Sequence, residues 1–158
     1  MRQKKQKWNP GDILEIPLGD GMRAFARVLK SPLMAFYDLK ADKNPPIDFI
    51  ISKPIAFKVW VMNSVVTAGE WQIIGHAPLA PELEMAPSFF KRDSISGKLS
   101  IYTESGGKSL EKDATLEECE KLECAAVWSS CHIADRLNDH FVERPNKWVE
   151  STKPRPKA

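Results

Sequence analysis

Hydrophobic and polar residues alternate along the first part of the chain, a pattern typical of β-strands that bury one face. The alternation is clearest in three runs, residues 12–18, 22–30 and 33–39. A Gly-Asp-Gly sequence at 19–21 separates the first two runs, so we expect them to pair as a hairpin. Pro17 has no amide hydrogen for a sheet ladder, which predicts a sheet edge near this residue.

Residues 55–62 predict a central strand, because apolar side chains occupy both of its faces. Short apolar runs between glycine and proline residues predict further strands. These runs are residues 49–51, 71–75, 89–91 and 99–102. The last two are expected to form a hairpin, and the polar residues 103–113 are interpreted as a loop.

The sequence after residue 113 changes to patterns typical of helices. Thr115 and Glu118 have the spacing of a capping box, in which each side chain binds the other residue's amide, so a short helix is expected to end near Lys121. Residues 125–128 are interpreted as a short strand, with an extension of that helix as the alternative.

A second helix is predicted from apolar residues that recur every four positions between Ile133 and Phe141. Ser129 or Ser130 is expected to cap its start, and Pro145 to stop it. Strands that come first and helices that follow argue against a parallel sheet with alternating helices. The expected fold is therefore α+β and mainly β, a curved antiparallel sheet or partly open barrel with one or two C-terminal helices.

The length of 158 residues and a hydrophobic content of 42% fit one globular domain, which we assign to residues 11–150. The net charge of +2 conceals basic ends, since residues 1–10 carry four bases, residues 151–158 carry three, and neither segment contains an acid. Without those seven bases, the body holds 16 bases and 21 acids, a net charge of −5. The ends are interpreted as solvated tails, with nucleic-acid-binding arms as the alternative.

Candidate chemistry is sparse. Three clustered cysteines, Cys119, Cys124 and Cys131, do not resemble a secreted disulfide scaffold, so reduced thiols in a cytoplasm are expected. The sequence contains no glycine-rich phosphate loop, hydrolase motif, paired zinc knuckle or long apolar span. No catalytic residue, metal, cofactor or membrane contact is expected, and an enzyme that uses Cys131 or a histidine remains the alternative.

The strongest charge feature is residues 111–123, which hold six acids and two bases. The simpler interpretation is a solvated helix face. The functional interpretation is an anionic docking surface, which would accelerate encounter with a basic partner.

Several blocks, taken in order, resemble the immunity protein 26 family of bacterial polymorphic toxin systems. The blocks are Gly11-Asp12, Ile16–Gly21, Ala24–Val28, Tyr37-Asp38, Phe57–Val61, Gly69–Trp71, Ile74-Gly75, Leu122-Glu123, Ala125–Trp128, Asp135–Leu137 and Pro145-Asn146. The resemblance implies a small, cytoplasmic, mainly β protein that protects its producer by binding a toxin from its own system. It implies no cofactor and no catalysis.

A nuclease toxin would have a basic cleft, and an acidic surface would complement it. The expected partner-binding residues are Glu117, Glu118, Glu120 and Glu123, with Asp135 and Asp139 beside them. The main alternative is a small β-barrel module that binds nucleic acid through its basic tails. The oligomeric state is left open by the sequence.

Overall fold

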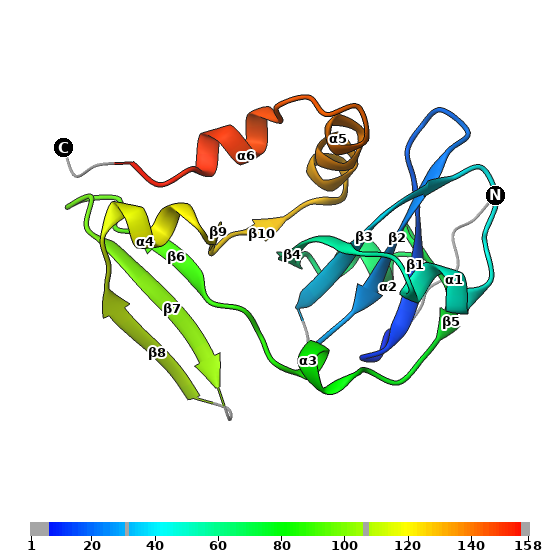
Figure 1. Cartoon of the computed structure of the whole chain (residues 1–158), viewed down its shortest axis with the longest axis horizontal. Coiled ribbons are helices and arrows are strands. Elements are labelled where there is room, and N and C mark those ends of the chain that lie inside the picture. The colour runs from blue at the N-terminus through cyan, green and yellow to red at the C-terminus, as the bar shows by residue number, and fades with distance from the viewer. Residues whose placement is uncertain (1–6, 31, 106–107, 156–158) are drawn as a thin grey trace.

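The computed structural model describes residues 7–30, 32–105 and 108–155. One group of strands comprises β1 (Asp12–Pro17), β2 (Arg23–Val28), β3 (Leu33–Ala41), β4 (Ile55–Val61), β5 (Gln72–His76) and β10 (Val127–Trp128). The other comprises β6 (Phe89–Arg92), β7 (Leu99–Ser105), β8 (Lys108–Asp113) and β9 (Glu123–Cys124). Within the described residues they form a main sheet of order β10-β4-β3-β2-β1-β5 and a small sheet of order β8-β7-β6-β9 (Figure 1).

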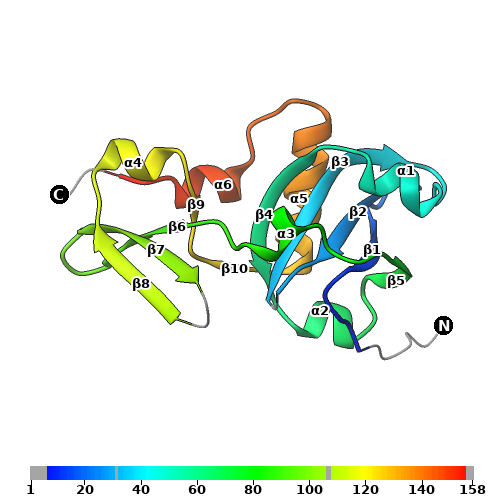
Figure 2. The ribbon, with the colours of Figure 1, turned by 60° about the horizontal axis from the view of Figure 1, so that its bottom comes forward.

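The helices are short and lie around both sheets. They are α1 (Ile47–Ile51), α2 (Ser64–Thr67), α3 (Pro81–Glu84), α4 (Leu116–Glu120), α5 (Ser130–Phe141) and α6 (Lys147–Thr152). Figure 2 shows α3 in front of the main sheet and α5 behind it, while α4 and α6 lie at the side of the small sheet. The mainly β fold that the sequence predicts is therefore confirmed, with the strands divided between two sheets.

The main core lies between one face of the large sheet and α5. Ile133 and Leu137 of α5 are fully buried against alternating strand residues such as Ile16 and Phe36. Burying a side chain of this size stabilises the fold by about 2 kcal/mol. The apolar stripe predicted for this helix is confirmed, and Ser129 is its N-cap, since its hydroxyl accepts the amide of His132.

The opposite face of the main sheet holds a buried charged side chain, Arg27. Its guanidinium donates to the carbonyls of Gly11 (3.3 Å), Ala77 (2.6 Å) and Pro78 (2.8 Å) and to the Tyr37 hydroxyl (3.2 Å). Neutral oxygens therefore take the donors of this cation, as the burial of a charged group requires. The contacts tie the chain before β1 to the chain after β5.

The small sheet carries its own apolar cluster beneath α4. Phe90 and Leu99 lie on one face of the sheet, and Cys119 of α4 packs against them with its side chain fully buried. This packing determines which side of the short helix α4 faces solvent.

Aromatic and ionic contacts join the small sheet to the main one. The Trp60 ring of β4 lies 4.6 Å from the Phe89 ring and 5.8 Å from the Tyr102 ring, centroid to centroid. Glu123 of β9 forms an ion pair with Arg136 of α5. Aromatic contacts thus join the small sheet to β4 of the main sheet, and the ion pair joins it to α5.

Several local predictions are confirmed. β1 and β2 pair antiparallel as the expected hairpin, with Pro17 opposite Arg23. β5 pairs with β1 only along Asp12–Glu15, so β1 does form a sheet edge at Pro17. The hairpin of β6 and β7 also forms, and residues 125–128 contain the short strand β10.

The predicted strand at 49–51 is wrong, because these residues belong to helix α1. A short apolar run fits a buried strand and a buried helical turn equally well. In the folded chain Ile50 is buried while the preceding Phe49 is exposed. Pro46 lies just before the helix and Asp48 in its first turn, which are both helix-start signals.

The predicted loop at 103–113 is also wrong, since most of it forms the end of β7 and the whole of β8. Every residue of β8 is exposed, so the strand has no buried face and no apolar alternation to reveal it. The tail expected from residue 151 begins later, because α6 extends to Thr152. Asn146 caps α6 by accepting the amides of Trp148 and Val149, each at 3.0 Å.

Candidate partner-binding site

The acidic helix α4 begins with the predicted capping box. The Thr115 hydroxyl accepts the amide of Glu118 at 3.2 Å, and the Thr115 amide donates to the Glu118 carboxylate at 3.1 Å. The Thr115 hydroxyl also donates to this carboxylate at 3.1 Å, and the hydrogen bonds donated by the Thr115 amide and hydroxyl lower the pKa of Glu118. The Glu118 charge is therefore permanent near neutral pH, but its carboxylate is directed at the start of its own helix.

Glu117 and Glu120 present the outward charges of α4. Both are exposed, and among the described residues neither has a hydrogen bond or an ion pair. Cys119 lies between them in sequence and faces the small-sheet core. Because the buried cysteine fixes the orientation of the helix, the two glutamates are held toward solvent.

Glu123, a further predicted contact residue, forms an ion pair within the protein. Its two carboxylate oxygens accept from both terminal nitrogens of Arg136, one of them at 3.2 Å. The Arg136 guanidinium also lies 3.7 Å from the Phe57 ring centroid and 5.1 Å from that of Trp128. This arrangement stabilises the fold and leaves Glu123 less available than Glu117 or Glu120.

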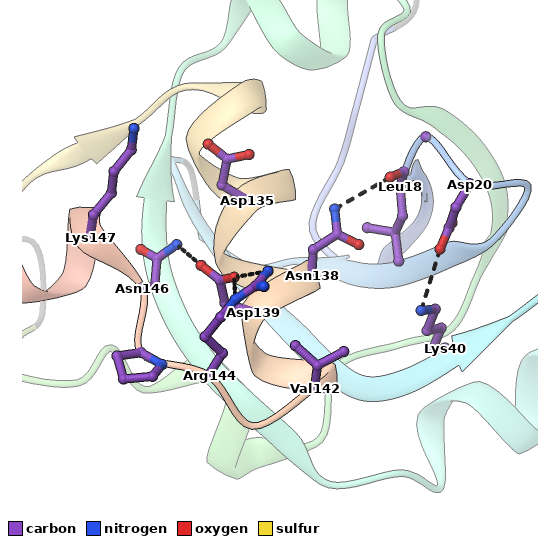
Figure 3. A pocket seen from close by; sticks show the side chains of 12 residues that line it. Leu18, Asp20, Lys40, Asp135, Asn138, Asp139, Val142, Arg144, Asn146 and Lys147 are labelled. Atoms are coloured by element: carbon purple, nitrogen blue, oxygen red, sulfur yellow. Dashed lines mark hydrogen bonds and ion pairs between the residues drawn. The ribbon is translucent and has the colours of Figure 1, made fainter.

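Asp135 and Asp139 lie away from α4, in the wall of an open pocket of about 770 Å³ (Figure 3). The pocket is bounded by α5, the segment between α5 and α6, and the turn between β1 and β2. Its other charged lining residues are Asp20, Lys40, Arg144 and Lys147. Three acids thus stand against three bases, and the described lining has no net charge.

The polar groups of this pocket are largely paired with one another. Asp139 accepts from Arg144 Nε at 2.7 Å and from Asn146 Nδ2 at 2.9 Å, and these two hydrogen bonds lower the pKa of Asp139. Asp135 accepts from the indole nitrogen of Trp148 at 3.1 Å. Figure 3 shows Asp139 between Asn146 and Arg144, with dashed lines to both. The pocket presents a fixed shape rather than an excess of charge.

The histidines serve packing and surface pairing. His132 stacks on Trp148 with 3.7 Å between ring centroids, His140 lies 2.9 Å from Asp38, and His76 lies 2.8 Å from Asp12. These contacts account for all three histidines of the sequence.

The cysteines are free thiols at increasing exposure along the chain: Cys119 is buried, Cys124 is intermediate and Cys131 is exposed. Burial raises the pKa of Cys119 and of Cys124. Within the described part of the chain, no three His, Cys, Asp or Glu side chains are placed to hold a metal ion. In the same residues, no helix has both the length and the apolar character needed to span a bilayer.

The sequence also matches a model of a known family, Immunity protein 26, over residues 9–100. This match covers more than half of the chain. The chain belongs to the immunity protein 26 family. No curated protein and no solved structure matches it.

Membership in the immunity protein 26 family confirms the resemblance, and it gives the chain the role of an immunity protein. The match includes β1 to β6 and enters β7, so it covers nearly all of the main sheet. The remaining elements, from β8 to α6, follow the matched region. All six predicted contact residues lie in that later part, where the family match neither supports nor opposes them.

Two features of the site were not found from the sequence. Asn146 caps α6 and donates a hydrogen bond to Asp139. Asparagine is a preferred N-cap residue, so its place directly before the first residue of α6, Lys147, was an available signal. The pocket is lined by residues near positions 20, 40 and 140. These segments are far apart in the sequence, so the sequence pattern does not reveal that they come together.

Proposed function

We propose that this immunity protein binds a toxin of the same bacterial system and neutralises it by covering the toxin's active surface. The family match over residues 9–100 is the observation that carries this proposal. The arrangement of the histidines and cysteines supports a role without chemistry, because Cys131 contacts Ser129 rather than a histidine among the described residues. The reduced thiols fit action in the cytoplasm.

The proposed first contact is the outward face of α4, with Glu117 and Glu120 as its main charges. Free carboxylates on a fixed helix attract a basic partner and orient it during encounter. A nuclease, whose cleft must attract phosphates, is the toxin class that this surface fits best. Glu118 adds charge at the helix start.

Glu123, Asp135 and Asp139 are proposed to have supporting roles. Their carboxylates bind Arg136, Trp148 and Arg144 respectively, so they hold the shapes of the small-sheet junction and of the pocket. A partner that spans α4 and the α5 pocket would contact the exposed parts of these three side chains after the first encounter.

The function can be tested with the product of the gene adjacent to this one. Cells that express this product alone should lose viability, and co-expression of the immunity protein should restore it. Restored growth, together with a complex of the two proteins on gel filtration, is the expected result. Killing that persists despite abundant immunity protein would contradict the proposal.

The proposed surface needs a separate test. The double substitution Glu117→Lys and Glu120→Lys should slow association with that product about tenfold at low salt, since steering governs the encounter rate. The matched control is Glu82→Lys with Glu84→Lys, which makes the same charge change on exposed residues of α3. An equal effect of the two double variants would remove α4 from the interface.

A further inference from the structure

A second pocket, of about 480 Å³, lies between β6 and the segment that follows α6. Its lining includes Lys91 and Arg92 from β6, and Lys153 and Arg155 from the C-terminal segment. No acidic residue lines it in the described part of the chain. Figures 1 and 2 both show this segment running beside the small sheet, away from α5.

The two arginines have no internal counter-charge. Among the described residues, neither Arg92 nor Arg155 forms an ion pair or a side-chain hydrogen bond. Two guanidinium groups at one pocket repel each other, so this arrangement costs free energy until an anion joins them. It contrasts with the α5 pocket, where every acid faces a base or a donor.

The two lysines are held by weak, exposed pairs. Lys91 lies 3.1 Å from Glu111, and Lys153 lies 2.8 Å from Glu150. An exposed pair contributes about 0.2–1 kcal/mol, so the Lys153 ammonium can turn to a bound anion. Lys91 also lies over the Tyr102 ring, 4.3 Å from its centroid, on the face of β6 opposite to Arg92. The pocket therefore offers two guanidinium groups without a counter-charge and one ammonium group that exchanges readily.

The chemistry of these side chains fits a phosphate group. A guanidinium presents a planar fork of donors that matches two oxygens of a phosphate, and an ammonium adds a point charge. The rest of the lining is Phe90, which is only 2% exposed, together with Cys124, Ala125, Ser151 and Thr152.

We propose that this pocket binds the phosphate groups of single-stranded nucleic acid. The activity requires no toxin. The site adjoins α4, because Thr152 and Lys153 also line a neighbouring pocket that includes Glu120. Lys153 and Arg155 are thereby assigned to a site shared with β6, instead of to a solvated tail.

The test measures binding of a fluorescently labelled oligothymidine to the full chain by anisotropy at several salt concentrations. The double substitution Arg92→Gln with Arg155→Gln should weaken binding at least tenfold. It should also flatten the plot of log K against log salt by about 1.4, because each phosphate contact with a single strand contributes a slope of about 0.7. The matched control is Lys43→Gln with Lys108→Gln, which removes the same charge from two exposed residues.

Competition experiments identify the ligand. Displacement of the oligothymidine by millimolar adenosine monophosphate would show that one phosphate group suffices for binding. A lack of displacement would show that several linked nucleotides are needed. Both results support a phosphate site. Displacement by a hexaglutamate peptide as efficient as by unlabelled oligothymidine of equal charge would overturn it. So would equal effects of the two double variants.

Discussion

The Arg136 guanidinium of α5 donates hydrogen bonds to both carboxylate oxygens of Glu123 on β9, with 3.2 Å between Nη1 and Oε2. This pair connects a helix of the main core to a strand of the small sheet. The Arg136 side chain is 11% exposed, so removal of its partner leaves a mostly buried cation. The pair is therefore important for the attachment of the small sheet.

Glu123→Ala should lower the free energy of unfolding by about 2 kcal/mol, because loss of one partner leaves the other buried and unpaired. Arg136→Met combined with Glu123→Leu should cost less than Glu123→Ala alone, since no charge then remains buried. Urea unfolding followed by tryptophan fluorescence measures both. If the double variant were the less stable of the two, the pair would be contributing more than its desolvation costs.

Gly11 is required by both its backbone and its surroundings. It has a φ of +99°, and an added Cβ would lie 2.6 Å from the Ala77 carbonyl oxygen and 2.8 Å from His76 Cε1. Gly11→Ala should therefore destabilise the protein by about 2–3 kcal/mol.

Gly19→Ala is the matched control, because its φ is +89° but no atom lies within 4 Å of the added Cβ. It should cost about 1 kcal/mol, from backbone strain alone. Thermal unfolding compares the two variants. Equal losses would show that crowding at Gly11 is unimportant.

Asp139 should make stability depend on pH. Its pKa in the folded protein is lowered from the ordinary 3.8 by Asn146 and Arg144, so its ionised form adds stability at pH 7 that is lost as pH falls through the folded value. Asp139→Asn should be less stable than wild type at pH 7 by about 1 kcal/mol. The difference should shrink below about pH 4. Urea midpoints from pH 7 to pH 2.5 measure it, and a constant difference would exclude the ionic origin.

The three thiols should react with a maleimide in a fixed order. Cys131 is exposed, Cys124 is partly buried and Cys119 is fully buried, and burial raises the pKa of the latter two. Because the thiolate is the reactive form, Cys131 should be labelled first and Cys119 only on unfolding. Peptide mass spectrometry of timed samples reads the order. Early labelling of Cys119 in the native protein would mean that α4 opens readily.

The sequence predicted the elements that bury a patterned face. Alternate residues of β1 and β2 enter the main core, and α5 carries a stripe from Ile133 to Phe141, so the period of the apolar residues identified each of them. β8 was missed because its six residues are all exposed, so its backbone pairing with β7 leaves no apolar alternation in the sequence. Its backbone hydrogen bonds to β7 therefore could not be predicted from its side chains.

The candidate site was predictable only in part, for a similar reason. The capping box of α4 is local, and the spacing of Thr115 and Glu118 revealed it. The engagement of Glu123 by Arg136, and the meeting of Arg92 with Arg155 at one pocket, depend on how distant segments pack. From the sequence, all six acidic residues are candidates for partner binding. Among the described residues, the structure shows which carboxylates are already paired within the protein and which, as in Glu117 and Glu120, are not.

The most direct test of the account is a titration of toxin activity with purified immunity protein, using the product of the adjacent gene. Occlusion predicts a linear loss of activity that ends when the two proteins reach a fixed stoichiometric ratio, with the toxin recovered unmodified after denaturation. Complete and lasting inactivation by a hundredth of that amount would show that the protein acts as a catalyst, and would contradict the central claim.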